Sequence, residues 1–482
     1  MSRGCLLATL LFLVLAQPAW PASIVISNGD GAGEGLNDPN PPAFANQKGN
    51  NPGSTLGEMR LNVFNAVAAQ WGGLLNSDIT ITVNAQFNSL QCSALSGVLG
   101  SASAVSTASN FGAGLPNIVY HIALAESLAG TNLNGGAAEL TAQFNSELDA
   151  GDPDCLGGGG FYYGLDGNAP EGTTPLFTVV LHELSHALGF THFADVGPGG
   201  TGAWTGTGGF PDAFSRNLFD LETGESWSEM VNAERLASAI NSPDLVWAGT
   251  HVTASRPQFL SPAPELQINA PGAIVGTHPA VRGDEPDAVI PPGGATGNLF
   301  DGNALVGDPC NDIPAGVANE LVLYDLPAQQ DCLAVIPAFL AELGGAAGVV
   351  IRNTAASGLP DISGVISNQD VTIPYVGVEQ SVGDALRANI GTANATIQES
   401  DTVFNGDNQG KLRMYAPAGF MAGSSVSHWA NEATPDLLME PVRGSLAYDQ
   451  VDITVAAMAD IGWSVNYPDG DPILIFEDGF ED

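Results

Sequence analysis

The chain has 482 residues, which is enough for two or three domains with their own hydrophobic cores. Twelve lysine and arginine residues face 52 aspartate and glutamate residues, so the formal net charge is −40 at pH 7. This charge argues against nucleic acid, anionic membrane surfaces and heparin as partners. The 60 glycines and 32 prolines indicate that much of the chain forms turns and loops.

Residues 1–22 have the pattern of a secretory signal peptide. Arg3 supplies a positive charge, residues 5–16 form a short apolar run, and residues 18–22 end in small side chains, with cleavage expected near Ala22. No other stretch reaches the roughly 18 consecutive apolar residues that a membrane helix needs. We therefore expect an exported protein, secreted or periplasmic, with no membrane span in the mature chain.

Four cysteines remain once Cys5 is removed with the signal peptide. An even number of cysteines in an oxidising compartment predicts disulfide bonds. Four cysteines can form two disulfides in three ways, and we favour the one with sequence-local bonds, Cys92 with Cys155 and Cys310 with Cys332.

The mature chain begins with a Gly-, Asn- and Pro-rich segment at residues 23–54, which we expect to be extended. Thr55 to Glu58 has the pattern of a capping box, and apolar residues follow at helical spacing as far as Trp71, which predicts the first core helix. Residues 78–87 alternate between apolar and polar, as a half-buried strand does. We expect a further helix at residues 139–148.

A short helix is predicted between residues 174 and 189. Thr174 is suited to cap its N-terminus, Pro175 suits the first helical position, and Gly189 suits the left-handed conformation that ends a helix. An apolar stripe on this helix is expected to face the core. It consists of Phe177, Leu181, Leu184 and Leu188.

The same helix carries a His-Glu-x-x-His motif, His182-Glu183-Leu184-Ser185-His186, and His192 follows shortly after it. Residues four apart lie on one face of a helix, so His182 and His186 can direct two imidazoles at one metal ion. The seven histidines of the chain are too few for this arrangement to be expected by chance. The spacing therefore predicts a zinc site, with the apolar stripe on the opposite face.

Beyond this helix, residues 225–240 resume helical periodicity. From about residue 256 to 395 the chain alternates short apolar runs, at residues 321–324, 348–351 and 373–378, with helical stretches at 334–343 and 381–389. This alternation predicts a small α/β or α+β module.

Candidate functional residues return near the end of the chain. His428 lies in a Ser-rich segment, Met439 lies in the segment Leu437-Leu438-Met439-Glu440-Pro441, and a last helix is expected within residues 452–463. An acidic tail begins at residue 466.

The motif ending at Gly189, together with Leu438-Met439-Glu440-Pro441, resembles the metzincin zinc proteases. In that family the zinc helix ends at the glycine and a Met turn lies beneath the metal. The resemblance implies that His182 and His186 are zinc ligands, that Glu183 is the general base, and that Met439 supports the site by packing.

Two histidines compete for the place of the third ligand. His192 stands where the common metzincin pattern has it, six residues after His186. His428 stands where the leishmanolysin-like arrangement has it, shortly before the Met turn and beyond an insertion. Three protein ligands and a water fill a tetrahedral site, so only one of them is needed. We favour His428, because its segment and the Met turn match together.

The inserted segment, especially residues 310–390, resembles a protease-associated domain, which implies a noncatalytic lid or docking module. The expected fold class is α+β: a metzincin-like zinc protease domain split by a small α/β protease-associated domain. The expected order is a signal peptide at 1–22, the first protease part at 23–255, the insertion at 256–397, the second protease part at 398–465, and the acidic tail at 466–482.

The expected function is that of a secreted zinc endopeptidase acting on protein or peptide substrates. The cofactor is Zn²⁺, and the acidic composition also suits Ca²⁺. A strand near residues 79–87 is a candidate for binding an extended peptide at a sheet edge. Two alternatives stay open: a noncatalytic binding or surface protein with a structural zinc, and a zinc amidase acting on a non-peptide substrate.

Overall fold

The computed structural model describes residues 20–44, 47–150, 153–327, 332–356, 358–366, 370–441 and 450–467. Most of the predicted signal peptide and of the acidic tail lies outside these residues, so both stay predictions. Within the described part, no helix has the length and apolar character needed to cross a membrane. The chain divides into two compact units: unit 1, Met1–Phe259 with Lys411–Asp482, and unit 2, Leu260–Gly410.

Unit 1 is built on a four-stranded sheet with the order β1-β2-β6-β3. The strands are β1 (Ile24–Asn28), β2 (Ile81–Asn88), β6 (Leu140–Asn145) and β3 (Gly100–Ala104). The first three are parallel, and β3 runs antiparallel to β6 at one edge, with Gly100 opposite Phe144. The expected strand at 78–87 is thus β2, but β2 lies inside the sheet, so it cannot be the peptide-binding edge.

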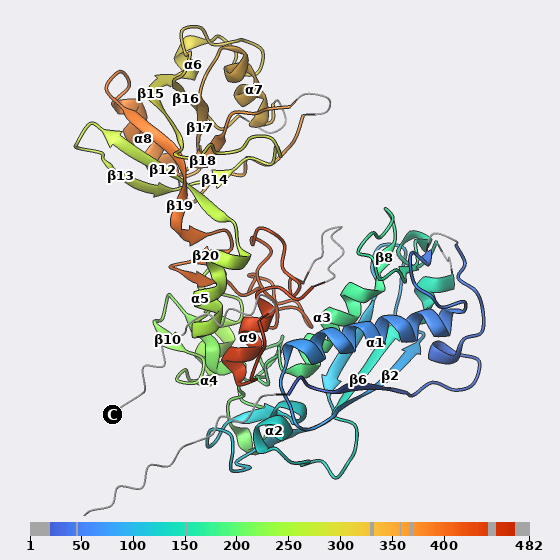
Figure 1. The fold of residues 1–482 in the computed structure, drawn as a ribbon. Helices are drawn as coiled ribbons and strands as arrows, with labels where there is room; N and C mark the ends of the chain where they lie inside the picture. Colours follow the sequence, from blue (N-terminus) through green and yellow to red (C-terminus); the bar gives the residue numbers. More distant parts are fainter. Residues whose placement is uncertain are drawn as a thin grey trace, which may run out of the picture. The chain divides into compact units, whose positions relative to one another are not determined.

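The long helix α1 (Leu56–Leu74) begins as the sequence predicts. Thr55 and Glu58 form the capping box, in which the Thr55 side chain accepts a hydrogen bond from the Glu58 backbone N–H at 3.2 Å. The helix α1 packs against β1 and against the helix α3 (Leu176–Leu188). Phe64 of α1 meets Phe144 of β6 edge to face, with ring centroids 5.0 Å apart. Figure 1 shows α1 running along the sheet.

The prediction of a helix at residues 139–148 is wrong. Residues 140–145 form the strand β6, followed by a short 3-10 helix, Ser146–Ala150. Leu140, Ala142 and Phe144 are buried while Thr141 and Gln143 are more exposed, and this two-residue period is that of a strand. The predicted helix at 225–240 is also shorter than expected, because only Asn232–Ser238 (α4) is helical and Glu225–Ser226 forms β10.

The rest of unit 1 consists of short elements around these layers. A three-stranded sheet has the order β10-β9-β11, and α5 packs against α9. The remaining elements are β4 (Thr107–Ser109), β5 (Val119–His121), α2 (Ile122–Ala129), β7 (Phe161–Tyr162), β8 (Thr174–Pro175), β9 (Leu218–Asp220), β11 (Leu245–Trp247), α5 (Thr250–Phe259), β21 (Lys411–Leu412) and α9 (Thr454–Ile461).

Unit 2 contains one eight-stranded mixed sheet with the order β13-β12-β19-β15-β16-β17-β18-β14. Strands β15 to β18 are parallel to one another, and β12, β19 and β14 pair antiparallel with their neighbours. The eight strands are β12 (Pro262–Ala270), β13 (Gly276–Pro279), β14 (Val281–Arg282), β15 (Ala295–Asp301), β16 (Leu321–Asp325), β17 (Gly348–Arg352), β18 (Tyr375–Val378) and β19 (Asn394–Phe404). The short strand β20 (Asp407–Asn408) is not part of this sheet.

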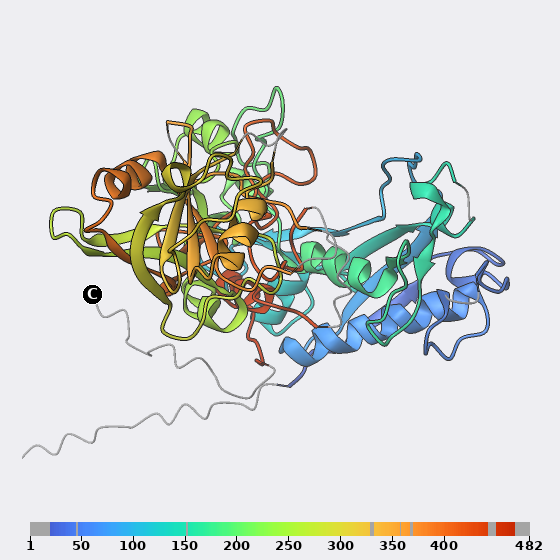
Figure 2. The ribbon, with the colours of Figure 1, turned by 90° about the horizontal axis from the view of Figure 1, so that it is seen from above.

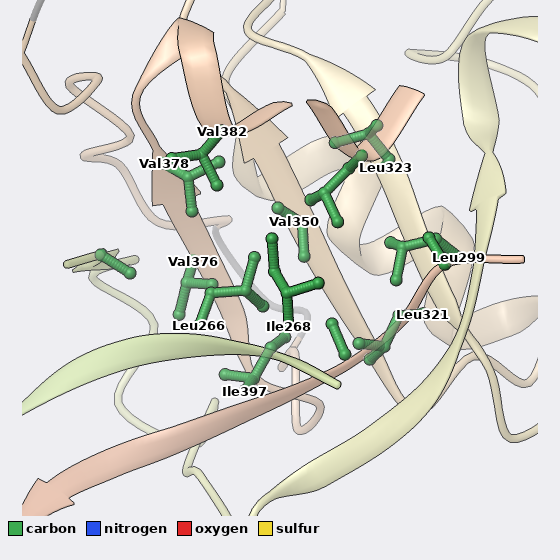
Figure 3. Close-up of a cluster of buried hydrophobic side chains, with 14 of the residues drawn as sticks. Leu266, Ile268, Leu299, Leu321, Leu323, Val350, Val376, Val378, Val382 and Ile397 are labelled. Atoms are coloured by element: carbon green, nitrogen blue, oxygen red, sulfur yellow. The ribbon is translucent and has the colours of Figure 1, made fainter. Parts of the chain in front are cut away.

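Side chains alternate between the two faces of this sheet. Leu321 and Leu323 of β16 enter one buried cluster, while Val322 and Tyr324 enter another. Figure 3 shows the first cluster, to which Val382 of helix α8 (Gln380–Ala388) belongs. The helix α7 (Val335–Leu343) packs into the second cluster, and a short helix α6 (Gly302–Leu305) precedes β16. Figure 2 shows α7 and α8 on opposite sides of the yellow strands.

The sequence located the helices and central strands of this unit within a few residues, but the predicted end of the insertion at 397 falls inside β19. Strand β19 pairs with β12 from Asn394 to Phe404, so it belongs to unit 2 as a whole. Both predicted disulfides, Cys92–Cys155 in unit 1 and Cys310–Cys332 in unit 2, are present.

Candidate metal centre

Helix α3 carries the His-Glu-x-x-His motif, and its ends differ in part from expectation. The helix starts at Leu176 after Pro175, and Thr174 lies in the short strand β8, so Thr174 is not the cap. Gly189 ends the helix with φ 134°, a conformation that side chains rarely adopt. A Cβ at this position would also lie 2.6 Å from the end of the Ile461 side chain, which would have to move, but it is the φ angle that favours glycine here.

The axis of α3 is fixed by packing on most of its circumference. Leu181, Leu184 and Leu188 are fully buried, whereas Phe177, expected on the same stripe, is half-buried. The Trp71 indole donates to the Leu181 carbonyl at 3.3 Å, and the Trp463 indole donates to the Leu188 carbonyl at 3.0 Å. These bonds, added to the buried leucines, hold the backbone that presents the histidines.

Three imidazoles meet at this helix. His182 and His186 come from α3, and His428 comes from the segment that follows β21, 242 residues after His186. The Nε2 atom of His428 lies 3.2 Å from Nε2 of His182 and 3.3 Å from Nε2 of His186. All three ligand atoms lie within 4.8 Å of one another.

The Nδ1 atom of each ring faces a backbone carbonyl. His182 Nδ1 lies 2.7 Å from the Leu438 oxygen, His186 Nδ1 lies 2.7 Å from the Phe190 oxygen, and His428 Nδ1 lies 2.8 Å from the Ser424 oxygen. A carbonyl oxygen only accepts hydrogen bonds, so each Nδ1 must carry the proton. Each neutral ring therefore directs an unprotonated Nε2 at the other two.

Three such lone pairs cannot hydrogen-bond to one another, so this arrangement is suited to hold a cation between them. A tetrahedral zinc ion with Zn–N bonds of about 2.0–2.1 Å places its ligand nitrogens roughly 3.3–3.4 Å apart. The two Nε2 distances from His428, 3.2 and 3.3 Å, agree with this spacing. The donor set of three imidazoles, each fixed by a carbonyl, fits zinc and leaves a fourth position open.

The surroundings of the site keep these rings neutral. Burial lowers the pKa of His186 to about 4, and the Phe190 carbonyl opposes this shift. Burial lowers the pKa of His428 to about 3, and the neighbouring His186 ring adds to the effect. Neutral imidazole is the form that binds a metal.

The segment around Met439 lies directly against the metal-binding side chains. Met439 is fully buried, its carbonyl accepts a hydrogen bond from the Trp429 backbone N–H at 2.9 Å, and the preceding Leu438 carbonyl is the partner of His182. The Leu438 backbone N–H in turn donates to the partly buried carboxylate of Asp452. This segment therefore positions two of the three histidines, one directly and one through its neighbour Trp429.

Glu183 follows the first histidine on α3. It is half-buried, between the buried side chains of His182 and Leu184. A partly exposed carboxylate on the residue next to the first of these histidines suits proton transfer. Its role stays a prediction.

The structure does not bring His192 into the group. Its Nδ1 accepts a hydrogen bond from the Ala194 backbone N–H at 3.1 Å, and its ring lies beside Trp227, with centroids 6.0 Å apart. The competing prediction of His192 as third ligand therefore has no support in the geometry, while His428 stands in the place of that ligand. The helix ends at Gly189, and the His192 side chain bonds to the backbone of Ala194, two residues further along the chain.

Sequence reasoning missed the three carbonyls that orient the rings, those of Phe190, Ser424 and Leu438. Any residue type supplies a carbonyl, so no side-chain pattern reveals them. The described residues contain no second group of three or more metal-binding His, Cys, Asp or Glu side chains. The expected calcium sites stay a prediction.

The chain matches no protein-family model and no curated protein. Among solved structures it is similar in part to the zinc aminopeptidase BSAP from Bacillus subtilis, with 20% identity, a TM-score of 0.23, and coverage of 31% of this chain and 36% of that one. An aminopeptidase from Aneurinibacillus sp. strain AM-1 has 18% identity and a TM-score of 0.21, with coverage of 30% and 32%.

The psychrophilic subtilisin-like protease Apa1 from the Antarctic psychrotroph Pseudoalteromonas sp. AS-11 has 19% identity and a TM-score of 0.23, with coverage of 29% and 34%. The chain thus spans about a third of the length of each of these proteases. Likenesses of this extent assign neither the fold nor the reaction of this chain.

Proposed function

We propose that this protein is an exported zinc endopeptidase with a metzincin-like catalytic unit in the leishmanolysin-like arrangement. The observation that carries the proposal is the convergence of three Nε2 lone pairs, from His182, His186 and His428, with each Nδ1 bound to a carbonyl. The half-buried Glu183 of the motif and the buried Met439 are consistent with the roles proposed for them.

A zinc ion bound at this centre would supply polarisation of the scissile carbonyl and activation of a water molecule near neutral pH. The protein supplies the rest. Glu183 accepts the proton of the attacking water and passes it to the leaving amine. The three carbonyls keep the imidazoles in one tautomer and one orientation, so the ligands need no rearrangement.

We further propose that the peptide substrate pairs with strand β3. Among the described strands, β3 pairs with β6 alone, so its other side is an edge of the sheet. Helix α3 packs against β3, which places this edge beside the helix that carries the motif. An extended peptide bound to a strand edge gains backbone hydrogen bonds independent of its sequence, which suits an endopeptidase.

For unit 2 we propose a protease-associated module that docks substrates or restricts access. Its mixed sheet with helices on both faces is of the expected α/β type. Its described residues contribute nothing to the group of metal-binding side chains, in keeping with a noncatalytic role.

A structural zinc in a noncatalytic protein is less well supported. Structural sites are closed by a fourth protein ligand, often cysteine. In the described part of the chain the group contains three histidines and no fourth ligand, and all four cysteines of the mature chain are in disulfides. The remaining alternative, a zinc amidase for non-peptide substrates, would have the same centre and differs only in what it cleaves.

The proposal is tested by the variant Glu183→Gln. This change removes the base and leaves the imidazoles in place, so we expect normal zinc content and a loss of casein hydrolysis of about 10²-fold or more. Glu171→Gln, at an exposed glutamate, is the matched control and should keep full activity. Full activity of Glu183→Gln, or a wild-type protein that binds no zinc, would refute the proposal. Hydrolysis of a panel of non-peptide amides, compared with hydrolysis of casein, distinguishes a zinc amidase from an endopeptidase.

A further inference from the structure

Unit 2 contains a cavity between the hairpin of β12 and β13 and the helix α8. Its volume is about 380 Å³, at the lower end of the range of about 300–1,000 Å³ found for ligand sites. The apolar lining continues the first buried cluster of the sheet, in which Figure 3 labels Ile268 and Val382. Five apolar side chains line the cavity: Ile268, Ile274, Val275, Val382 and Ala385. Val275, in the turn of the hairpin, is 53% exposed, so the lining reaches the surface of unit 2 at that turn.

One carboxylate also lines the cavity. Glu379 precedes the first turn of α8, and its side chain forms no capping hydrogen bond with the helix. Glu379 is exposed, and the ion pairs among the described residues of unit 2 do not include it. The other polar side chains of the lining are those of His278 and Ser381. The cavity thus combines apolar walls with one negative charge that has no cationic partner in the described part of the unit.

The charge of unit 2 as a whole has the same sign. Its range, Leu260–Gly410, contains 18 aspartate and glutamate residues against three arginines and no lysine. All three arginines, Arg282, Arg352 and Arg387, form ion pairs with carboxylates of the unit. The N-terminus of α8 contributes a partial positive charge of about half an elementary charge, which is less than the full charge of Glu379. The cavity therefore favours a cationic ligand.

A free edge of the sheet lies beside the cavity. Among the described strands β13 pairs with β12 alone, with Thr277 opposite Gln267. The Ala280 backbone N–H donates to the Pro264 carbonyl, and hydrogen-bonded pairs alternate with other pairs along an antiparallel ladder. The backbone N–H and C=O of Thr277 therefore point away from β12. An extended peptide can form two backbone hydrogen bonds with them.

The pairing of such a peptide directs a side chain toward the cavity. Directly opposite residues share a face of a sheet, so the peptide residue that pairs with Thr277 lies on the face away from His278. The neighbours of that residue along the peptide lie on the face of His278, which lines the cavity. Arginine and lysine have an apolar stem and a charged head, so they match apolar walls with a carboxylate.

We propose that this cavity is a docking site for a basic side chain, arginine in preference to lysine, in an extended substrate segment that pairs with β13. The stem packs on the apolar lining, and the head forms an ion pair with Glu379. A guanidinium can bond a carboxylate through two N–H groups, whereas an ammonium acts as a point charge. The inference rests on the proposed function, because it gives the proposed docking module a class of substrate: polypeptides with basic extended segments.

The test measures the binding of fluorescein-labelled peptides to the full chain with Glu183→Gln, so that no peptide is cleaved, by fluorescence anisotropy. The peptides share an extended sequence rich in threonine and valine, and one central position is arginine, lysine, norleucine or glutamate. Norleucine keeps the apolar stem and lacks the charge. We expect affinities that fall in this order, with arginine bound about 3- to 10-fold more tightly than norleucine at low salt. Added salt should reduce this difference.

Two further substitutions locate the binding in the cavity. Glu379→Gln should bind the arginine and norleucine peptides with equal affinity, because it removes the charge and keeps the size of the side chain. Ala385→Phe fills the cavity and should weaken the binding of both peptides by about 10-fold or more. Ala388→Phe makes the same change at an exposed position of α8 and should leave both affinities unchanged.

Equal affinities of the arginine and norleucine peptides at low salt, or an arginine preference that Glu379→Gln keeps, would overturn the inference. Binding of the glutamate peptide as tight as that of the arginine peptide would overturn it too. A dimer in solution that Ala385→Phe dissociates would show that a second copy occupies the site, with the same consequence. Binding in the expected order, together with a wild type that hydrolyses no casein, would refute the proposed function and leave the docking site intact.

Discussion

Glu440, in the segment next to Met439, is 3% exposed, and burial raises its pKa to about 8, with further upward contributions from Asp436, Asp452 and Glu432. The Leu437 backbone N–H, which donates to its carboxylate at 3.1 Å, opposes this shift. A carboxyl group with a raised pKa binds its proton more tightly in the folded state than in the unfolded state. Its stabilising contribution is complete below about pH 4.5 and is lost as the pH rises through about 8.

We therefore predict that the free energy of unfolding falls between pH 6 and pH 9 by about 1–2 kcal/mol more in the wild type than in Glu440→Gln, since water screens part of the interaction. Glutamine keeps the acceptor for Leu437 and does not titrate. Urea unfolding at both pH values measures the difference. Parallel pH dependence in the two proteins would show that Glu440 is not responsible.

The residues of the site were predictable where a side chain carries the information. The grouping of His182 with His186 followed from helical spacing, and that of His428 with them from its place before the segment that contains Met439. The sequence did not decide which of His192 and His428 joins His182 and His186, because spacing along the chain does not tell where the backbone turns after Gly189. The contact of His192 with Ala194 and the positive φ of Val426, 73°, depend on backbone geometry, which the sequence does not display.

At the scale of elements, α1 is tied to the rest of unit 1 by a buried ion pair. Arg60 is 2% exposed, and its guanidinium lies 2.5 Å from the carboxylate of Asp149, in the 3-10 helix after β6. It also donates to the Gly35 carbonyl at 2.6 Å and lies over the Phe87 ring, 4.3 Å from its centroid. Burial raises the pKa of Asp149, and Arg60 opposes that shift, so the carboxylate depends on its partner.

Arg60→Met should lower the free energy of unfolding of unit 1 by about 3–5 kcal/mol, because it leaves a carboxylate buried without its partner. Arg216→Met, at an exposed arginine of the same unit, should change it by less than about 0.5 kcal/mol. Denaturant unfolding followed by tryptophan fluorescence compares the two. Similar small effects would mean that Asp149 is neutral in the folded protein.

The elements themselves were predictable to different degrees. The capping box fixed the start of α1, because a local pair of hydrogen bonds determines it. Residues 139–148 were predicted as a helix, because Leu140, Phe144 and Leu148 recur at helical spacing, yet Leu140–Asn145 forms β6, in which Leu140, Ala142 and Phe144 alternate with more exposed residues. Pairing with β2 and β3 decides between them, and this pairing involves distant residues.

At the scale of the whole molecule, each compact unit has its own disulfide and its own buried side chains. The Cys92–Cys155 bond closes a separation of 63 residues and Cys310–Cys332 one of 22. In the chain-entropy description, these loops correspond to about 4 and about 3 kcal/mol of stabilisation.

We predict two calorimetric unfolding transitions. Cys92→Ser/Cys155→Ser should shift only the transition of unit 1, and Cys310→Ser/Cys332→Ser only that of unit 2, each to lower temperature. Under the proposed function, removal of zinc should lower the temperature of the unit 1 transition alone, because His182, His186 and His428 belong to unit 1. A single transition that both pairs of substitutions shift equally would contradict independent units.

The division into units was predictable in outline, because the alternation of strands and helices beyond residue 256 differs from the preceding sequence. The end of the insertion was not, because β19 continues past 397 in contact with β12. The pairing of β19 with β12, more than 100 residues earlier in the chain, defines that boundary, and no change in composition marks it.

The 242 residues between His186 and His428 also have a consequence in time. When the ribosome has completed unit 2, the nascent chain contains only two of the three imidazoles, and the segment with His428 and Met439 has not yet been synthesised. Under the proposed function, such a nascent chain cannot cleave its neighbours or itself, and a product shortened before residue 428 is inert. Under this proposal, the order of the ligands along the chain delays proteolysis until the segment with His428 has been synthesised.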